Sequence, residues 1–254
     1  MVEGRDITLG LVAGGQGRRL GGVAKGLLEV GGRASLEWLL DLAPGLGCVL
    51  LGAPDASPYA AFGLDPVADV VAGKGAPGGV VSLLLAAKTP WVLCVACDMP
   101  FVRPAHVEAL RLRAGPDVDA VVAARRGARV IRSGETRRVD GAPLHGDGSP
   151  VDPTRPRVVG AAQQARTAPA NDETAGAHGS RPTRARTESL DAFEPLLGLY
   201  RSSLGREWLP QLAQNPSLRS LVASSRWAAV ELDPDALDSL NTPDDLARAR
   251  ARGG

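Results

Sequence analysis

The sequence predicts an α/β fold of three layers, in which a mostly parallel, twisted sheet carries helices on both faces. Apolar runs of strand length alternate along the chain with segments of helical character, which is the pattern of such sheets. The run at residues 91–97 is continuously apolar, as is typical of a central parallel strand covered on both faces. With 254 residues and 44% hydrophobic content, the chain can bury one sizeable core, and we expect a single domain over residues 1–254.

The individual elements follow from the apolar runs and from the residues that begin or end them. The final helix has the clearest start, because Thr242 is a good N-cap and Pro243 suits the first helical position. Asp244 and Asp245 then complement the helix dipole. Strands are expected near residues 7–13, 48–52, 66–71, 91–97, 118–124 and 227–232, and helices at about 35–42, 79–87, 104–113, 204–213 and 243–252.

Residues 126 to about 189 interrupt this alternation. The segment is rich in Arg, Gly, Pro, Ala and Thr and nearly free of aromatic residues, so it cannot bury enough apolar surface to offset the entropy of ordering the chain. We therefore expect a low-complexity, mobile insertion within the domain. The segment contains eleven Arg and seven acidic residues, so it carries a net positive charge. A solvated linker explains this charge, and the alternative interpretation is a lid that attracts an anionic phosphate.

A glycine-rich, basic turn follows the first expected strand. Three glycines within residues 14–17 permit positive φ and bring backbone N–H groups close to an anion. Arg18, Arg19 and Lys25 add full positive charges, and a mixture of planar Arg forks and a mobile Lys suits a chain of phosphates. A solvated surface turn is the alternative interpretation.

Two better-known glycine loops do not fit this segment. A P-loop places its Lys before a hydroxyl residue that holds magnesium, but Lys25 is followed by Gly26. A dinucleotide fingerprint needs a third glycine where this chain has Leu20, and this failure also disfavours a dehydrogenase. The turn is therefore interpreted as an open loop around phosphates.

Asp98 ends the apolar run at residues 91–97. A carboxylate at the carboxyl end of a central strand points into the crevice where α/β sheets bind ligands. Magnesium prefers one or two carboxylates together with phosphate oxygens, so Asp98 is the candidate metal ligand. The alternative is an aspartate that caps the turn before Pro100. Cys94 and Cys97 form a CxxC pattern, but three positions apart on a strand they point to opposite faces, which argues against a zinc or redox pair.

Two motifs, AGGxxxRxGGxxKGLL at residues 13–28 and CDMPF at residues 97–101, occur together in this chain. In this combination the chain resembles the molybdenum cofactor guanylyltransferases, a family within the nucleotidyltransferase group, and the AGG start favours the guanylyl over the cytidylyl branch. The chain departs from the family at Ala24, where an acidic residue is usual, and at Ser239, where an asparagine is frequent. The resemblance covers about 190 residues through DVVAGKGAPGGVVSLLLAA (69–87), FEPLLGLY (193–200) and LNTPDDLARA (240–249).

The resemblance implies a Rossmann-like nucleotidyltransferase fold and the transfer of GMP from GTP to the terminal phosphate of molybdopterin, with Mg²⁺ as cofactor and pyrophosphate as leaving group. A phosphate monoester is already ionised at neutral pH, so no general base is required. The implied catalytic residues are Arg19, Lys25 and Asp98, with Asp98 on the metal. The implied nucleotide contacts are Val12, Ala13, Gly14, Gly15, Lys25, Asp69 and Asp98, with Asp69 at the guanine or ribose, and the implied acceptor side holds Pro195, Tyr200 and Asn241.

Composition narrows the partners and the compartment. A net charge of +1 argues against nucleic acid as a partner. The start lacks a signal pattern and no apolar run approaches the roughly 18 residues of a membrane span, so we expect a cytoplasmic protein. Three cysteines, an odd number, fit a reducing compartment. The expected partners are GTP, molybdopterin and molybdoenzyme maturation proteins. A cytidylyl- or sugar-nucleotidyltransferase and a non-catalytic nucleotide-binding partner in molybdoenzyme maturation remain the alternatives.

Overall fold

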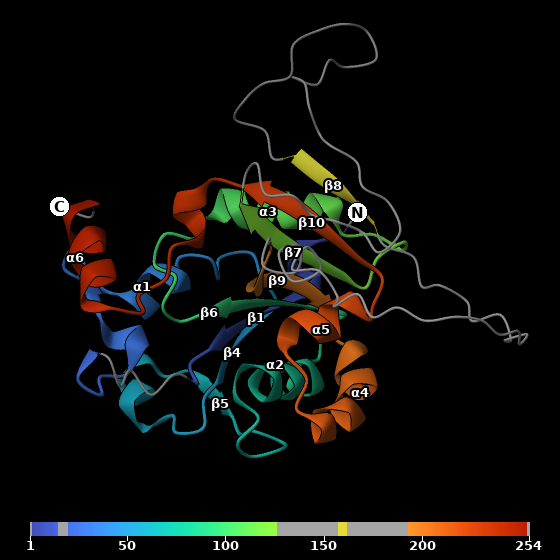
Figure 1. The fold of residues 1–254 in the computed structure, drawn as a ribbon, viewed down its shortest axis with the longest axis horizontal. Coiled ribbons are helices and arrows are strands. Elements are labelled where there is room, and N and C mark those ends of the chain that lie inside the picture. Colours follow the sequence, from blue (N-terminus) through green and yellow to red (C-terminus); the bar gives the residue numbers. More distant parts are fainter. Residues whose placement is uncertain (1, 15–19, 126–156, 162–192, 253–254) are drawn as a thin grey trace, which may run out of the picture.

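A mixed sheet forms the centre of the protein (Figure 1). The computed structural model describes residues 2–14, 20–125, 157–161 and 193–252, and in them eight strands pair in the order β5-β4-β1-β6-β9-β7-β10-β8. Their bounds are β1 Ile7–Val12, β4 Cys48–Gly52, β5 Asp65–Val67, β6 Trp91–Ala96, β7 Ala120–Arg125, β8 Arg157–Ala161, β9 Phe193–Arg201 and β10 Trp227–Leu232. A separate hairpin pairs β2 (Glu29–Val30) with β3 (Arg33–Ala34).

Most strands of the sheet run parallel, which confirms the expected sheet type. Strands β5, β4, β1 and β6 pair in parallel, as do β7 and β10. Strand β9 lies between β6 and β7 and is antiparallel to both, and β8 is antiparallel to β10 at the edge. The carboxyl ends of β1 and β6 therefore lie together on one edge of the sheet.

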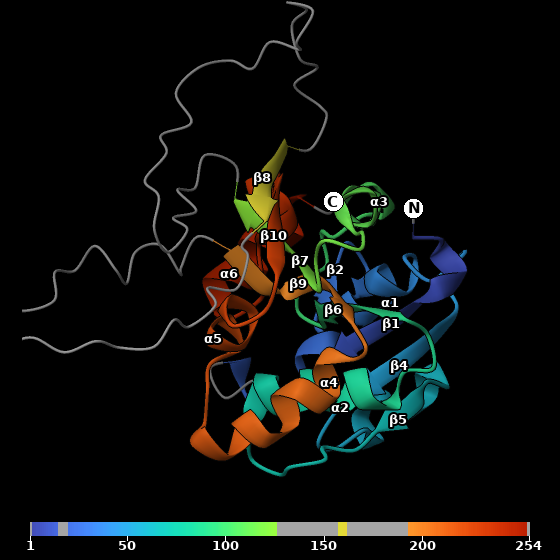
Figure 2. The same cartoon turned by 90° about the vertical axis from the view of Figure 1, so that its right-hand side faces the viewer.

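Helices cover both faces of the sheet, as the sequence predicts. The helices are α1 Ser35–Leu40, α2 Gly75–Ala86, α3 Pro104–Arg113, α4 Leu204–Trp208, α5 Leu218–Ala223 and α6 Pro243–Arg252. Buried side chains of α1 and α3 form one core cluster with one face, and those of α2, α4 and α5 form a second cluster on the other face (Figure 2). Helix α6 packs on the β2–β3 hairpin side through a third, smaller cluster that includes Leu28, Val30 and Ala249.

Strand β9 was not among the expected strands. The segment contains Pro195, which lacks an N–H and is tolerated in a sheet only at edges or bulges. The register accommodates it: Val122 pairs with Gly198, but the next residue, Ala123, pairs with Glu194. Residues 195–197 thus form a bulge beside β7, and the long separation from β7 in sequence concealed their pairing.

Several expected boundaries are wrong for local reasons. The helix expected at 204–213 is α4 followed by a 3₁₀ helix at Leu209–Gln214, because Pro210 cannot continue the α-helical hydrogen bonding. Helix α2 begins at Gly75 rather than near residue 79, since its glycines weaken the sequence signal but allow close packing on β1. Strand β5 ends at Val67, so Asp69 follows the strand.

The insertion expected at 126–189 is described only in part. Residues 157–161 form β8, which the composition did not predict, and the rest of the range lies outside the described residues. In the ranges that the structure describes, no helix has both the length and the apolar character needed to cross a membrane.

Candidate functional site

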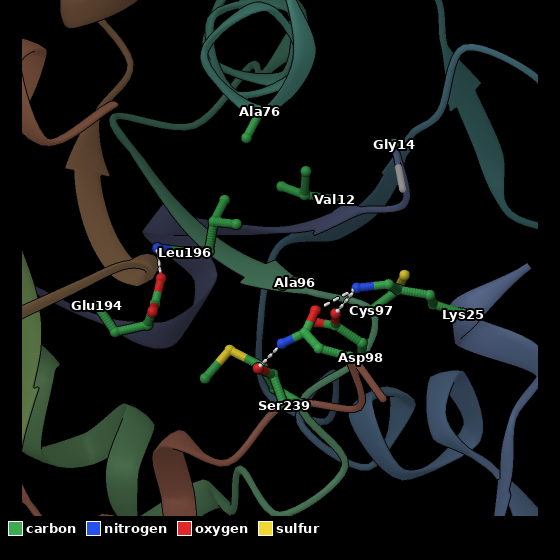
Figure 3. A pocket seen from close by; sticks show the side chains of 12 residues that line it. Val12, Gly14, Lys25, Ala76, Ala96, Cys97, Asp98, Glu194, Leu196 and Ser239 are labelled. Atoms are coloured by element: carbon green, nitrogen blue, oxygen red, sulfur yellow. Dashed lines mark hydrogen bonds and ion pairs between the residues drawn. The ribbon is translucent and has the colours of Figure 1, made fainter. Parts of the chain in front are cut away.

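A pocket of about 300 Å³ lies at the carboxyl ends of β1 and β6. This is the edge at which open α/β sheets bind ligands. Figure 3 shows Lys25 and Asp98 on one side of the pocket and Glu194 with Leu196 on the other. The lining comprises Val12, Gly14, Lys25, Ala76, Ala96, Cys97, Asp98, Met99, Glu194, Leu196, Ser239 and Asn241.

Lys25 joins three sequence motifs at one amine. Its Nζ donates to Asp98 Oδ2 at 2.8 Å and to Asn241 Oδ1 at 2.5 Å. The side chains of Lys25 and Asp98 are only 18% and 12% exposed, so water screens this pair less than it would screen a surface ion pair. The amine lies in the pocket lining, where it can neutralise the charge of a bound phosphate.

The backbone around Lys25 is fixed by a close approach. Residues Lys25–Leu27 form a short 3₁₀ turn that starts after Ala24. A Cβ at Gly26 would lie 2.8 Å from Tyr59 Cε1, closer than real Cβ atoms approach a ring, so only glycine fits against that ring. Positive φ occurs upstream at Gly21 (75°) and Gly22 (80°), whereas Gly14 has no positive φ, contrary to the expectation for its part of the loop.

Asp98 is held by its backbone, while its side chain faces Lys25. Its carbonyl oxygen accepts from Leu240 N at 2.9 Å, which ties the end of β6 to the segment before α6. The preceding residue, Cys97, donates its N–H to Val12 O and accepts from Ser35 Oγ. Within the described residues the carboxylate bonds to Lys25 and not to an amide of the turn, so the turn-capping alternative finds no support.

Asn241 both reaches the pocket and precedes a well-capped helix. Its Nδ2 donates to Ser239 Oγ at 2.6 Å, so Ser239 orients the amide that faces Lys25. Asp245 Oδ2 accepts from the backbone N–H groups of Asn241 and Thr242, and Thr242 Oγ1 accepts from Asp245 N. The capping predicted at Thr242 is confirmed, and it fixes Asn241 in place.

The donor set suits a metal that is shared with substrate. Asp98 presents one carboxylate, and its Oδ1 has no hydrogen-bond partner among the described residues. Across the described ranges, no group of three or more His, Cys, Asp or Glu side chains forms a metal cage. Mg²⁺ is commonly held by one or two carboxylates plus phosphate oxygens, so a single Asp98 fits that ion when a nucleotide supplies the remaining oxygens.

The other expected nucleotide contacts differ in their access to the pocket. Val12 and Gly14 line it. The backbone N–H of Ala13 donates to Gly52 O at 2.8 Å, so this amide is committed to the sheet and not to a ligand. Gly15 and Arg19 lie outside the described residues.

Asp69 lies beside the pocket and not in its lining. Its Oδ1 would be 4.0 Å from a Cβ built on Gly79, and Val12 would be 3.7 Å from the same point. Burial raises the pKa of this carboxyl above its usual value. Asp69 is thus next to the carboxyl end of β1, on the α2 side.

The three residues expected on the acceptor side do not lie together. Asn241 lines the pocket, and Pro195 is buried in the wall of an adjoining cavity of about 630 Å³. Tyr200 does not reach the site: it is fully buried, and it pairs with Val92 at the opposite end of β6. Its hydroxyl donates to Pro195 O at 2.5 Å, so it is a core residue that supports the bulge. Burial raises the pKa of Tyr200 well above its usual value.

Seven lining residues were not among the expected site residues: Ala76, Ala96, Cys97, Met99, Glu194, Leu196 and Ser239. Glu194 and Leu196 reach the pocket because of the β9 bulge, and Ala76 reaches it from the first turn of α2. Pro195 was the available signal, since proline inside a strand indicates a bulge. Cys94 and Cys97 fall in opposite core clusters, which confirms that they point to opposite faces.

The fold and the pocket define an α/β protein with a cation and a carboxylate at the carboxyl edge of its central strands. The chain belongs to the MobA-like NTP transferase domain family, whose model matches residues 10–230. This membership confirms the resemblance seen in the motifs. The family match includes the carboxyl end of β1, all of β6 and the bulged β9.

Curated relatives match the chain over part of its length. A "Molybdenum cofactor guanylyltransferase" of Acidovorax sp. (strain JS42) is 36% identical over 124 residues, which are 46% of this chain and 59% of the relative. A protein of the same description from Ralstonia nicotianae is 38% identical over 105 residues, which are 40% of this chain and 52% of the relative. The chain therefore spans just over half the length of these relatives.

Solved structures share the fold over nearly the whole chain. "Molybdopterin-guanine dinucleotide biosynthesis protein A" from Archaeoglobus fulgidus aligns with a TM-score of 0.60 at 18% identity, covering 96% of this chain and 97% of that one. "2-C-methyl-D-erythritol 4-phosphate cytidylyltransferase" from Thermus thermophilus aligns with a TM-score of 0.53 at 20% identity, covering 96% of both chains. At these identities the likeness concerns the fold, and it confirms the Rossmann-like nucleotidyltransferase architecture.

Proposed function

We propose that this chain is a nucleotidyltransferase that transfers GMP from GTP to the terminal phosphate of molybdopterin and releases pyrophosphate. The observation that carries the proposal is the convergence of Lys25, Asp98 and Asn241, from three separate motifs, on one pocket. The names of the curated relatives support guanine as the base and the molybdenum cofactor as the acceptor. Molybdoenzyme maturation proteins are the partners that such a product would require.

In the proposed reaction the acceptor phosphate attacks the α-phosphorus of GTP, the bond from this phosphorus to the β-phosphate bridging oxygen breaks, and pyrophosphate leaves. The attacking oxygen is already ionised at neutral pH, so the protein need not remove a proton. Catalysis then depends on positioning and on charge neutralisation. Lys25 would neutralise the phosphate charge, together with Arg19 from the glycine-rich loop.

Asp98 would hold Mg²⁺ through its carboxylate, and this ion would neutralise charge on the triphosphate. Lys25 then has a second role, because its ion pair with Asp98 at 2.8 Å orients the carboxylate toward the pocket. Asn241 accepts a hydrogen bond from the Lys25 amine and is itself oriented by Ser239, so it would hold this amine in position beside Asp98.

Pyrophosphate release tests the proposal. The protein is incubated with molybdopterin, Mg²⁺ and each of GTP, CTP, ATP and UTP in turn, and the pterin product is identified by mass spectrometry. We expect pyrophosphate and a guanylated pterin only with GTP. A cytidylated pterin would instead support a cytidylyltransferase. Pyrophosphate release when a sugar phosphate replaces molybdopterin as the acceptor would support a sugar nucleotidyltransferase.

Binding measured without turnover separates the non-catalytic alternative. At 100-fold saturation a ligand adds about 2.7 kcal/mol to the free energy of unfolding, which thermal shift detects. If GTP with Mg²⁺ stabilises the protein but no pyrophosphate appears with any acceptor, the chain is a nucleotide-binding protein and the proposed transfer is wrong.

A further inference from the structure

Glu194 places a carboxylate in the pocket wall away from the Lys25–Asp98 pair. The residue lines both the 300 Å³ pocket and the adjoining 630 Å³ cavity, so it lies where the two meet. Figure 3 shows its side chain across the pocket from Lys25. Its Oε1 accepts from Leu196 N at 3.0 Å, which leaves Oε2 without a hydrogen-bond partner among the described residues. No cationic side chain of the described ranges forms an ion pair with it.

The β9 bulge fixes the direction of this side chain. Glu194 pairs with Ala123 on one side of the bulge and Gly198 pairs with Val122 on the other. The buried hydroxyl of Tyr200 donates to Pro195 O and ties the bulge to the core. A Cβ built on Gly198 would lie 2.7 Å from the Tyr200 hydroxyl, which is too close for a real side chain, so the arrangement depends on this glycine. A carboxylate held in this way is a preorganised acceptor.

The sign of its charge limits what it can contact. A carboxylate repels phosphate, so in a pocket for a nucleotide and a phosphorylated acceptor it must face a part of the ligand that donates hydrogen bonds. A ring that carries an N–H next to an amino group offers two parallel donors, which match the geometry of a carboxylate. Guanine and pterin both present this edge, as a 2-amino-4-oxopyrimidine.

We propose that Glu194 recognises the paired N–H donors of a 2-amino-4-oxopyrimidine ring, contributed by the guanine of GTP or by the pterin of the acceptor. This inference rests on the proposed function for its choice of ligands. It makes Glu194 a specificity determinant, because a ring with a carbonyl at position 2 would meet the carboxylate with an acceptor.

The test is Glu194→Gln with two matched pairs of probes. Glutamine retains an oxygen for Leu196 N but replaces the second carboxylate oxygen by an NH₂ donor, so the bulge is kept and the acceptor is lost. GTP is compared with ITP, which lacks the amino group, and 6-hydroxymethylpterin is compared with 6-hydroxymethyllumazine, which has a carbonyl there. Dissociation constants are measured by calorimetry. Glu207→Gln on the exposed side of α4 is the control for loss of a charge.

We expect Glu194→Gln to raise the dissociation constant of one amino-bearing probe, GTP or the pterin, by about 10- to 100-fold, as for the loss of a hydrogen bond to a charged group. The dissociation constant of the matched probe without the amino group should change little. Weakening of GTP identifies the nucleotide as the source of the ring, and weakening of the pterin identifies the acceptor. Glu207→Gln should change neither.

Three results would overturn the proposal: unchanged affinity for all four probes, equal weakening within each pair, or no binding of any probe by the wild-type protein. Equal loss of GTP and ITP would show that Glu194 contacts ribose or a metal instead. Failure of the proposed function can be distinguished from failure of this proposal. A wild-type protein that binds GTP without releasing pyrophosphate would refute the transfer reaction, but its affinities for GTP and ITP would still test the role of Glu194.

Discussion

Lys25 Nζ donates to Asn241 Oδ1 over 2.5 Å, although 216 residues separate the two in the sequence. The same amine bonds to Asp98 from the central strand β6. The pocket is thus complete only when the first turn of the chain, the central strand and the segment before the last helix have all packed. One side chain links them, and its removal is the most direct test of the site.

Lys25→Ala should lower turnover by roughly two to three orders of magnitude, as the loss of one preorganised electrostatic donor does in other enzymes. The measurement is the rate of pyrophosphate release from GTP in the presence of molybdopterin. Lys88→Ala, at an exposed position after α2, is the control and should retain wild-type turnover. Wild-type turnover in Lys25→Ala would refute the assigned role.

Asp98→Asn should abolish Mg²⁺-dependent turnover and leave the fold intact. The amide keeps the size of the side chain, and the bond from Leu240 N to the backbone oxygen does not depend on the carboxylate. A hard cation, however, prefers a charged oxygen ligand. Calorimetry with Mg²⁺ and GTP, together with pyrophosphate release, measures the effect. Asp65→Asn, exposed on β5, is the matched control, and normal magnesium-dependent activity in Asp98→Asn would remove the metal from this position.

Tyr200→Phe should lower stability, because the hydroxyl supports the bulge from within the core. The substitution keeps the ring but leaves the buried Pro195 carbonyl without its donor, which costs about 1–3 kcal/mol of the free energy of unfolding. Urea denaturation measures the loss. A raised KM for molybdopterin at unchanged stability would instead restore Tyr200 to the acceptor side.

His106 should make stability depend on pH. Its Nδ1 accepts from Arg103 N at 3.0 Å at the start of α3, and burial lowers its pKa below the usual 6.5, although Asp233 opposes the shift. Between 6.5 and the lower pKa of the folded state, the unfolded chain binds more protons than the folded one. The free energy of unfolding therefore falls as pH falls through this window.

His106→Gln tests that contribution, because glutamine at this position can accept the same N–H and does not titrate. Chemical denaturation at a series of pH values should show a shallower slope below pH 6.5 for the variant than for the wild-type protein. Identical slopes would mean that His106 titrates equally in both states.

Deletion of residues 130–186 with a short Gly-Ser linker should leave a folded core. Strand β7 ends beside the start of β9, where Ala124 pairs with Phe193, so the two strands that flank the deleted range lie side by side. Loop length affects stability only logarithmically. Loss of β8 exposes the edge of β10 but removes no central strand. Insolubility, or loss of cooperative unfolding, would show that the deleted segment is structural.

The sequence by itself determined the central strands and the chemistry of the site. A continuous apolar run identified β6, as is typical of a strand covered on both faces, and apolar residues at Ile7, Leu9 and Leu11 before the glycine-rich turn identified β1. Lys25 and Asp98 were identified from local context, since a cation after a glycine-rich turn and a carboxylate at a strand end are defined by their immediate neighbours. The start of α6 was equally local, because capping involves residues within one turn.

Only the tertiary structure decided how distant segments meet. The antiparallel insertion of β9 between β6 and β7 depends on pairing across a long separation in sequence, which no local pattern reports. That pairing buries Tyr200 in the core and turns Glu194 into the pocket, although both belong to the same short motif. Side chains a few residues apart reach opposite ends of the sheet because a bulge and the strand direction, and not residue type, set where each one points.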